Sequence, residues 1–299
     1  MADLPGAPGR APAATGLPVP LVAALWMLGA IVSFSLMAIG GREMAVDLDT
    51  FEIMTYRSAI GLVLVLGFGI WRRRLHRIAT RRPGMHLVRN LFHFTGQNLW
   101  FYALALIPLA QVFAIEFTVP IWVALLAPLV LGEHMTRARL LAALLGFLGV
   151  LVVTRPGVSD FTIGHAAVVV AAFCFAGSFM STKRLSGTET VWTILFWMTF
   201  LQTVMGLGLG LADLDFALPP ANQLPWIAVV GFGGLIAHLC IATALSRAPA
   251  TVVAPMDFMR LPLIAVIGMA VYGEALDLAV FAGAALIIAG NLLNLRDRT

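Results

Sequence analysis

The chain has 299 residues, of which 60% are hydrophobic and only 11% are charged, and its mean hydropathy is +0.94. Soluble domains are about 45 to 50% apolar and about 25% charged, so this composition excludes a soluble globular protein. The formal net charge of +4 does not indicate a nucleic-acid partner, because the basic residues lie in short connectors between apolar segments.

From the N-terminus onward, a short polar tail precedes a series of apolar segments. Residues 1–19 are rich in Ala, Pro and Gly and are predicted to be a disordered tail rather than a signal peptide. Apolar segments of roughly 20 residues then follow, long enough to cross a bilayer. The predicted spans are 20–40, 50–71, 85–106, 109–131, 137–154, 162–182, 190–212, 222–245, 249–272 and 275–295. The expected fold is an all-α membrane protein with ten transmembrane helices.

The connectors differ in charge on the two sides of the membrane. Arginines crowd residues 72–82 after the second span, whereas the opposite side carries Asp47, Asp49, Asp213 and Asp215. Because cytoplasmic connectors carry an excess of Lys and Arg, both termini are predicted to be cytoplasmic. We expect a multi-pass protein of the bacterial inner membrane, with the lipid bilayer as its main partner.

An internal repeat relates the two halves of the chain at an offset of 141 residues (273 − 132). The matching residues are Pro108 with Pro249, Glu116 with Asp257, Gly132-Glu133 with Gly273-Glu274, and Gly149 with Gly290. Such agreement over several spans indicates duplication. The predicted repeats cover 20–154 and 160–295, and five spans in each make the second copy inverted, as in secondary transporters.

Each repeat ends in a Pro-containing helix, a Gly-Glu turn and a Gly-rich final helix. These residues are Pro120, Gly132-Glu133, Gly146 and Gly149, then Pro262, Gly273-Glu274, Gly283 and Gly290. The pattern resembles EamA-type members of the drug/metabolite transporter superfamily. The resemblance implies ten helices around a central cavity, alternating access to the two faces, and no ATP-hydrolysing domain. Asn90, His93, Gln97, Asn98 and Trp100 also resemble the third span of YddG-type exporters of aromatic and other amino acids.

The third span carries a polar stripe. Asn90, His93, Gln97 and Phe101 are spaced three and four residues apart and therefore share one helix face. They are predicted to line a substrate cavity, with His238 on the opposite half; the alternative is that they bond neighbouring helices. Trp100 and Phe101 are the preferred apolar wall for a substrate side chain.

Two acidic residues fall near the membrane midplane. Glu116 and Asp257 each follow a helix-starting proline by eight residues, or about 12 Å along a helix. They are predicted, with Phe258, to contact substrate, as sites for a substrate ammonium or for protons. For Asp257 the favoured alternative is a static ion pair with Arg260, three residues further on, whereas Glu116 has no cation close to it in the sequence.

Two other charged positions have structural interpretations. Arg57, with Glu52 and Tyr56 nearby, is predicted to brace the bundle or to contact an anionic group. Glu133 and Glu274 are predicted to cap the helices that follow them.

These features predict a secondary transporter that exports small metabolites, foremost neutral or aromatic amino acids, with protons as the candidate coupling ion. The alternatives are multidrug or lipophilic-cation efflux, a lipid flippase and a membrane-embedded enzyme. The sequence has no H-E-x-x-H metal motif, nucleophile elbow or phosphate loop, so we expect no catalytic residues, no metal and no cofactor.

Overall fold

The computed structural model describes residues 19–73, 75–131, 136–155, 160–212, 216–247 and 256–296. Within these ranges the chain forms helices and turns without a strand, which confirms the all-α class. The α-helices are α1 (Val19–Met44), α2 (Thr50–Trp71), α3 (Pro83–Leu106), α4 (Leu109–Glu116), α5 (Val119–Leu131), α6 (Arg137–Thr154), α7 (Ile163–Ser186), α8 (Val191–Gly210), α9 (Leu224–Arg247), α11 (Arg260–Tyr272) and α12 (Leu278–Arg296). The tail before Val19, the Gly132-Glu133 turn and Pro249 lie outside the described residues.

The helices have the length and composition of membrane spans. Among the described residues, six helical stretches are long and apolar enough to cross a bilayer, and three shorter helices are also apolar. α3 has 24 residues, or roughly 36 Å at about 1.5 Å per residue, against a hydrocarbon core of about 30 Å. The chain is a multi-pass membrane protein.

Polar side chains start the helices where the sequence offers them. At the start of α2, Asp49 accepts a hydrogen bond from the Glu52 N–H and the Glu52 carboxylate accepts one from the Asp49 N–H, both at 2.8 Å. Thr190 accepts from the Thr193 N–H at 3.1 Å at the start of α8. These caps satisfy N–H groups that have no partner inside the helix.

Two predicted spans are interrupted in the structure. The predicted span 109–131 divides into α4 and α5 at residues 117–118, and in the ninth span α11 begins only after a turn at 258–259. Pro120 and Pro262 follow these breaks. A proline has no N–H to donate and its ring clashes with the carbonyl four residues earlier, so the helix is broken just before it. Apolar length does not register this effect, so the two spans were predicted without their breaks.

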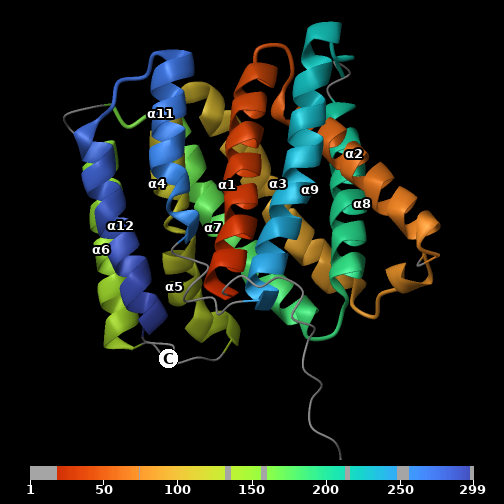
Figure 1. Cartoon of the computed structure of the whole chain (residues 1–299), viewed down its shortest axis with the longest axis horizontal. Helices are drawn as coiled ribbons and strands as arrows, with labels where there is room; N and C mark the ends of the chain where they lie inside the picture. Colours follow the sequence, from red (N-terminus) through yellow and green to blue (C-terminus); the bar gives the residue numbers. More distant parts are fainter. Residues whose placement is uncertain are drawn as a thin grey trace, which may run out of the picture.

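Long-range helix pairs build the bundle, as Figure 1 shows. α6 packs along α12, α2 along α8, and α1 along α9, while α3 packs along α7 and α4 along α11. Each pair joins the first half of the chain to the second. α1 begins and α12 ends at the same, lower edge of the view.

The α6–α12 pair has a very close helix crossing. A methyl group added at Gly149 would lie 2.6 Å from the Gly283 carbonyl oxygen, and one added at Gly283 would lie 2.5 Å from the Gly149 carbonyl oxygen. Only glycine allows the two backbones to approach this closely, as at other helix contacts in membranes.

Gly149→Ala is therefore expected to destabilise the protein by about 1 to 3 kcal/mol, because overpacking against backbone forces the helices apart. Thermal unfolding in detergent measures the change. Gly67→Ala is the matched control, because nothing lies within 4 Å of a methyl group at that position. Equal melting temperatures for the two variants would contradict the prediction.

Candidate functional site

α3 turns its polar stripe into the bundle. Asn90 is 0% exposed, and His93 and Gln97 are each 6% exposed, whereas Leu87 and Leu91 on the other face are 46% and 48% exposed. The predicted stripe avoids lipid because unsatisfied polar groups in hydrocarbon are costly. It therefore faces the helices of the second half.

A charged cluster lies at the end of α4. Arg260 Nη2 donates to Glu116 Oε1 at 3.2 Å and to Asp257 Oδ2 at 3.1 Å. The predicted Asp257–Arg260 pair is confirmed. Glu116, which has no cation nearby in the sequence, obtains one from 144 residues away.

Aromatic rings enclose the cation of this cluster. The Arg260 guanidinium lies 4.9 Å from the ring centroids of Phe34 and Phe113 and 5.4 Å from that of Phe117. Its side chain is only 4% exposed, whereas those of Glu116 and Asp257 are 16% and 27% exposed. The accessible part of the cluster is thus its carboxylates, which can contact a ligand or exchange a proton.

Trp100 holds the Glu116 carboxylate in place. Its indole Nε1 donates to Glu116 Oε2 at 2.8 Å, and its ring lies 5.3 Å from Phe101 and 5.8 Å from Phe113. Phe101 is fully buried and packs on Gly41, where an added methyl would come within 2.5 Å of the ring. In this structure Phe101 therefore fills the interface between α1 and α3.

Two histidines face each other across α3 and α9. The ring centroids of His93 and His238 are 6.1 Å apart, and His238 lies 5.8 Å from Phe34, which also contacts Arg260. His93 Nε2 and Gln97 Oε1 are buried without a hydrogen-bond partner among the described residues. Buried polar atoms usually have a partner, so these two are free to meet a ligand.

Asn90 bonds a neighbouring helix, which was the alternative to lining a substrate cavity. Its Nδ2 donates to the carbonyl oxygens of His86 at 2.8 Å and Trp197 at 3.4 Å. Its Oδ1 accepts from Arg89 Nη1 at 3.0 Å and Gln202 Nε2 at 3.3 Å. Asn90 thereby joins α3 to α8.

The two helix breaks meet each other. Phe117 and Phe258 contact edge to face with centroids 5.2 Å apart. Asn291 of α12 donates to the Phe117 carbonyl oxygen at 2.8 Å. A neighbouring helix thus satisfies a backbone group at the break, as in other broken membrane helices. Sequence reasoning missed Asn291, whose signal is an amide side chain within the apolar final span.

Arg57 joins two helices of the bundle, as predicted, but not through Glu52 or Tyr56. Glu52 accepts from the Asp49 and Ala217 N–H groups, and the Tyr56 hydroxyl donates to the Ala217 carbonyl oxygen at 2.7 Å. Arg57 Nη1 instead donates to Gln202 Oε1 at 3.4 Å. Capping the first turn of α2 directs Glu52 away from Arg57. Arg89, which sequence reasoning also missed, joins the same network beside Asn90.

Glu274 also has partners other than those predicted. Its carboxylate accepts from the Leu109 N–H at the start of α4, at 3.0 and 3.2 Å, and pairs with Arg42 of α1. Asp277 Oδ1 caps α12 instead, by accepting from the Ala279 N–H at 2.9 Å. The prediction that Glu274 caps the next helix was wrong. Its carboxylate instead bonds the free N–H at the start of α4 and the Arg42 side chain, both from the first half of the chain.

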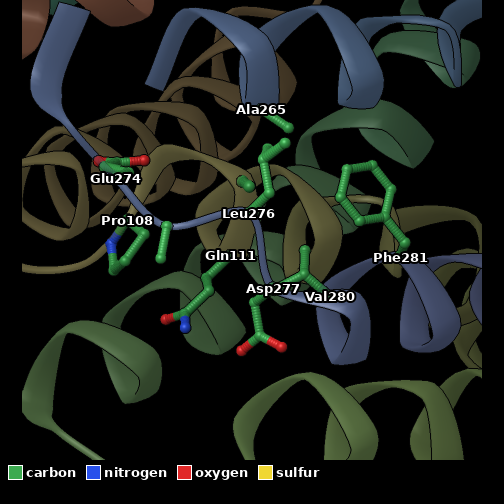
Figure 2. Close-up of a pocket in the computed structure, with 10 residues that line it drawn as sticks. Pro108, Gln111, Ala265, Glu274, Leu276, Asp277, Val280 and Phe281 are labelled. Atoms are coloured by element: carbon green, nitrogen blue, oxygen red, sulfur yellow. The ribbon is translucent and has the colours of Figure 1, made fainter. Parts of the chain in front are cut away.

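A cavity of about 190 Å³ lies beside this contact, and Figure 2 shows residues that line it. Pro108 and Gln111 line it from the α4 side, and Glu274, Asp277 and Phe281 line it from the second half. It contains none of the predicted substrate-binding residues. The cavity therefore belongs to the end of the bundle where α4 begins, apart from the charged cluster.

Comparisons with known proteins agree with this architecture. The chain is 30% identical to a riboflavin transporter of Vibrio cholerae, over 90% of this chain and 91% of that protein. It is 26% identical to an S-adenosylmethionine uptake transporter of Rickettsia felis, over 89% of this chain and 90% of that protein. A crystal structure of a protein covers 91% of this chain and 95% of its own, with a TM-score of 0.64 at 17% identity, which shows a shared fold alone.

The family comparison covers nearly all of the described helices. The model of the EamA-like transporter family matches twice, at residues 21–155 and 162–296. The buried charges at split helices lie inside these matched segments. The chain therefore belongs to the EamA-like transporter family, whose members move small metabolites across membranes.

Proposed function

We propose that this chain is a secondary transporter that exports small amphipathic metabolites, foremost neutral and aromatic amino acids, across the bacterial inner membrane. The observation that carries the proposal is the Glu116–Arg260–Asp257 cluster at the breaks of two helices. Ionisable groups inside a membrane protein mark substrate and proton pathways, and discontinuous helices hold substrates in secondary transporters.

The proposed architecture is ten spans in two inverted repeats, 20–154 and 160–295. Four helices of the second half, α8, α9, α11 and α12, begin 141 residues after α2, α3, α5 and α6 (for example, 191 − 50). The α6–α12 crossing shows the same offset of 141 residues. Gly149 of α6 packs on the Gly283 carbonyl of α12. The equivalent residues make the same contact with the two helices exchanged, because Gly290 of α12 packs on the Ala142 carbonyl of α6. A two-fold axis in the membrane plane accounts for this exchange of contacts.

An amino acid matches the chemistry between α3, α4, α9 and the segment that leads into α11. The ammonium group meets the accessible carboxylates of Glu116 and Asp257, and the free atoms of His93 and Gln97 offer hydrogen bonds. Trp100 supplies an aromatic surface beside them. A polar head and an apolar side chain are thus both accommodated, as in other small-molecule sites.

Riboflavin is the second candidate cargo. It is supported by the 30% identity to the Vibrio cholerae riboflavin transporter over most of both chains. Its heteroaromatic ring carries hydrogen-bonding groups that suit His93 and Gln97, whereas Glu116 and Asp257 have no ammonium to meet.

Uptake into proteoliposomes tests the proposal. The purified protein is expected to move amino acids, with riboflavin, S-adenosylmethionine and a lipophilic cation as the other members of the panel, with and without a pH gradient. Movement of the lipophilic cation alone would replace the proposed cargo by drug efflux. Scrambling of a fluorescent phospholipid without transport of any soluble compound would indicate a flippase.

Gln97→Leu and His93→Leu are each expected to weaken transport of a polar cargo five- to 150-fold, because a lost hydrogen bond to a buried group costs about 1 to 3 kcal/mol. Trp100→Ala is expected to affect bulky side chains most. Tyr102→Leu on the exposed face of α3 is the control. An unchanged KM in both polar variants, with intact folding, would contradict the assignment.

The proposed topology places both termini in the cytoplasm. Val46 is exposed in the turn after α1, and Thr188 is exposed in the turn after α7. A cysteine at Val46 is expected to react with an impermeant maleimide from outside intact cells, and one at Thr188 only after the cells are opened. The native Cys174 and Cys240 are buried and give little background. The reverse labelling pattern would overturn the orientation.

A further inference from the structure

Resting on the proposed transport function, we infer that Arg57 and Arg89 form a binding site for an anionic group of the cargo, a carboxylate or a phosphate. The two side chains come from α2 and α3 and lie 6% and 5% exposed. Arg57 is seven residues inside α2, or roughly 10 Å along the helix from its end. Both cations are thus buried within the bundle.

These two arginines differ from three other arginines, which the structure pairs with carboxylates. Arg42, Arg155 and Arg260 each form an ion pair with a carboxylate. In the part of the chain that the structure describes, no carboxylate forms an ion pair with Arg57 or Arg89. A buried charge without a counter-ion costs several kcal/mol, so a purely structural role is expected to include one.

Neutral amides hold the two guanidinium groups instead. Arg57 Nη1 donates to Gln202 Oε1 at 3.4 Å, and Gln202 Nε2 donates to Asn90 Oδ1 at 3.3 Å. Asn90 Oδ1 also accepts from Arg89 Nη1 at 3.0 Å, and Arg89 Nε donates to Thr182 Oγ1 at 3.2 Å. Amides and hydroxyls orient these cations without neutralising them. The resulting positive field is left for a ligand.

Unused donors remain at this site. Arg57 Nε is a buried donor with no hydrogen-bond partner among the described residues, and the ring nitrogen His93 Nε2 is also buried without one. The Arg57 guanidinium lies against Gly234 of α9, where an added methyl would come within 2.9 Å of Nη2. A planar guanidinium with free N–H groups suits bidentate recognition of a carboxylate or phosphate.

The site complements the acidic cluster. Arg57 lies against Gly234 of α9, four residues before His238, and His238 contacts Phe34, which lies beside Arg260. The interior thus has a cationic region at α2 and α3 and an acidic region at Glu116 and Asp257. A cargo with both charges, such as an α-amino acid, gains from each region, and a cargo with only an anion gains from the arginines.

Matched ligands that differ in one anionic group test this assignment. The pairs are L-phenylalanine with L-phenylalaninamide, and riboflavin 5′-phosphate with riboflavin; inorganic phosphate is the simplest probe. Binding is measured on the purified full chain in detergent by the shift of the melting temperature with ligand concentration. In wild type at least one anionic member is expected to bind about tenfold or more tightly than its neutral partner, as charge-assisted hydrogen bonds imply.

The variants assign the preference to these residues. Arg57→Gln and Arg89→Gln are expected to reduce the preference to about twofold or less, while Arg57→Lys, which keeps the charge, retains part of it. Arg72→Gln removes the same charge at an exposed position and is expected to leave the preference intact. A merely structural role predicts a lower melting temperature without ligand and equal weakening of both members of each pair.

Three results would overturn the inference. The first is that no anionic probe stabilises wild type more than it stabilises the Arg57→Gln/Arg89→Gln variant. The second is that the preference survives both substitutions. The third is that only phosphatidylglycerol added to the micelles stabilises the protein through Arg57, which makes a lipid headgroup the occupant. If the protein prefers the anionic ligands but does not transport amino acids, the inference stands and the proposed cargo is rejected. If it transports amino acids without that preference, the proposed cargo stands and the inference is rejected.

Discussion

Arg260→Gln is expected to lower the free energy of unfolding by about 3 to 5 kcal/mol, because removing one partner of a buried ion pair leaves an uncompensated charge. Here one guanidinium serves two carboxylates, Glu116 and Asp257, from opposite halves of the chain. The substitution also removes the cation enclosed by Phe34, Phe113 and Phe117. Denaturant unfolding in detergent micelles, followed by tryptophan fluorescence, measures the loss.

Two further variants isolate the charge effect. The triple change Arg260→Met, Glu116→Gln, Asp257→Asn removes all three charges together and is expected to recover much of the loss, since replacing a whole buried ion-pair group is often neutral. Arg72→Gln, at an exposed position, is expected to change stability by less than about 0.5 kcal/mol. A loss below about 1 kcal/mol for Arg260→Gln alone would show that the pairs contribute little.

Glu116→Gln is expected to abolish accumulation of cargo driven by a pH gradient. The amide keeps an acceptor for Trp100 Nε1 but can no longer take up or release a proton. One pH unit corresponds to 1.36 kcal/mol, or about a tenfold concentration ratio for one proton per cargo molecule. Wild-type proteoliposomes should therefore reach about tenfold accumulation, and the variant should only equalise the two concentrations.

A surface carboxylate provides the control for this experiment. Asp160→Asn, at an exposed position before α7, removes an acid outside the charged cluster and is expected to leave accumulation unchanged. Equal accumulation by wild type and Glu116→Gln would assign Glu116 a static role in its pair with Arg260. Facilitated diffusion in both, with no response to pH, would make the protein a passive carrier.

The repeat and the polar stripe illustrate what the amino-acid order determines locally. Apolar length places membrane helices, and intervals of three and four residues place Asn90, His93 and Gln97 on one face. The pairing of Asp257 with Arg260 is similarly local, because the two residues are only three apart in the sequence and lie on either side of the turn at 258–259. These features depend on residues that are close together along the chain.

Contacts between the two halves of the chain could be identified only in the folded structure. Nothing in the sequence near Glu116 indicates Arg260, nothing near Phe117 indicates Asn291, and nothing near Leu109 indicates Glu274. The same holds for the amide network that joins Arg57 to Arg89. Each contact depends on which helix of one half packs against which helix of the other.

The sequence by itself determined that this is an all-α membrane protein with a duplicated chain and an EamA-like pattern, because hydropathy, repeat offset and turn residues are properties of order along the chain. Only the tertiary structure decided where two helices break and which charges are paired. A proline weakens a helix locally, but a break inside a membrane is tolerated where a neighbouring helix bonds the freed backbone group, as Asn291 does for Phe117. The choice of a counter-ion likewise depends on neighbours far away in sequence. Arg260 pairs with carboxylates, whereas Arg57 and Arg89 donate hydrogen bonds to amide and hydroxyl oxygens.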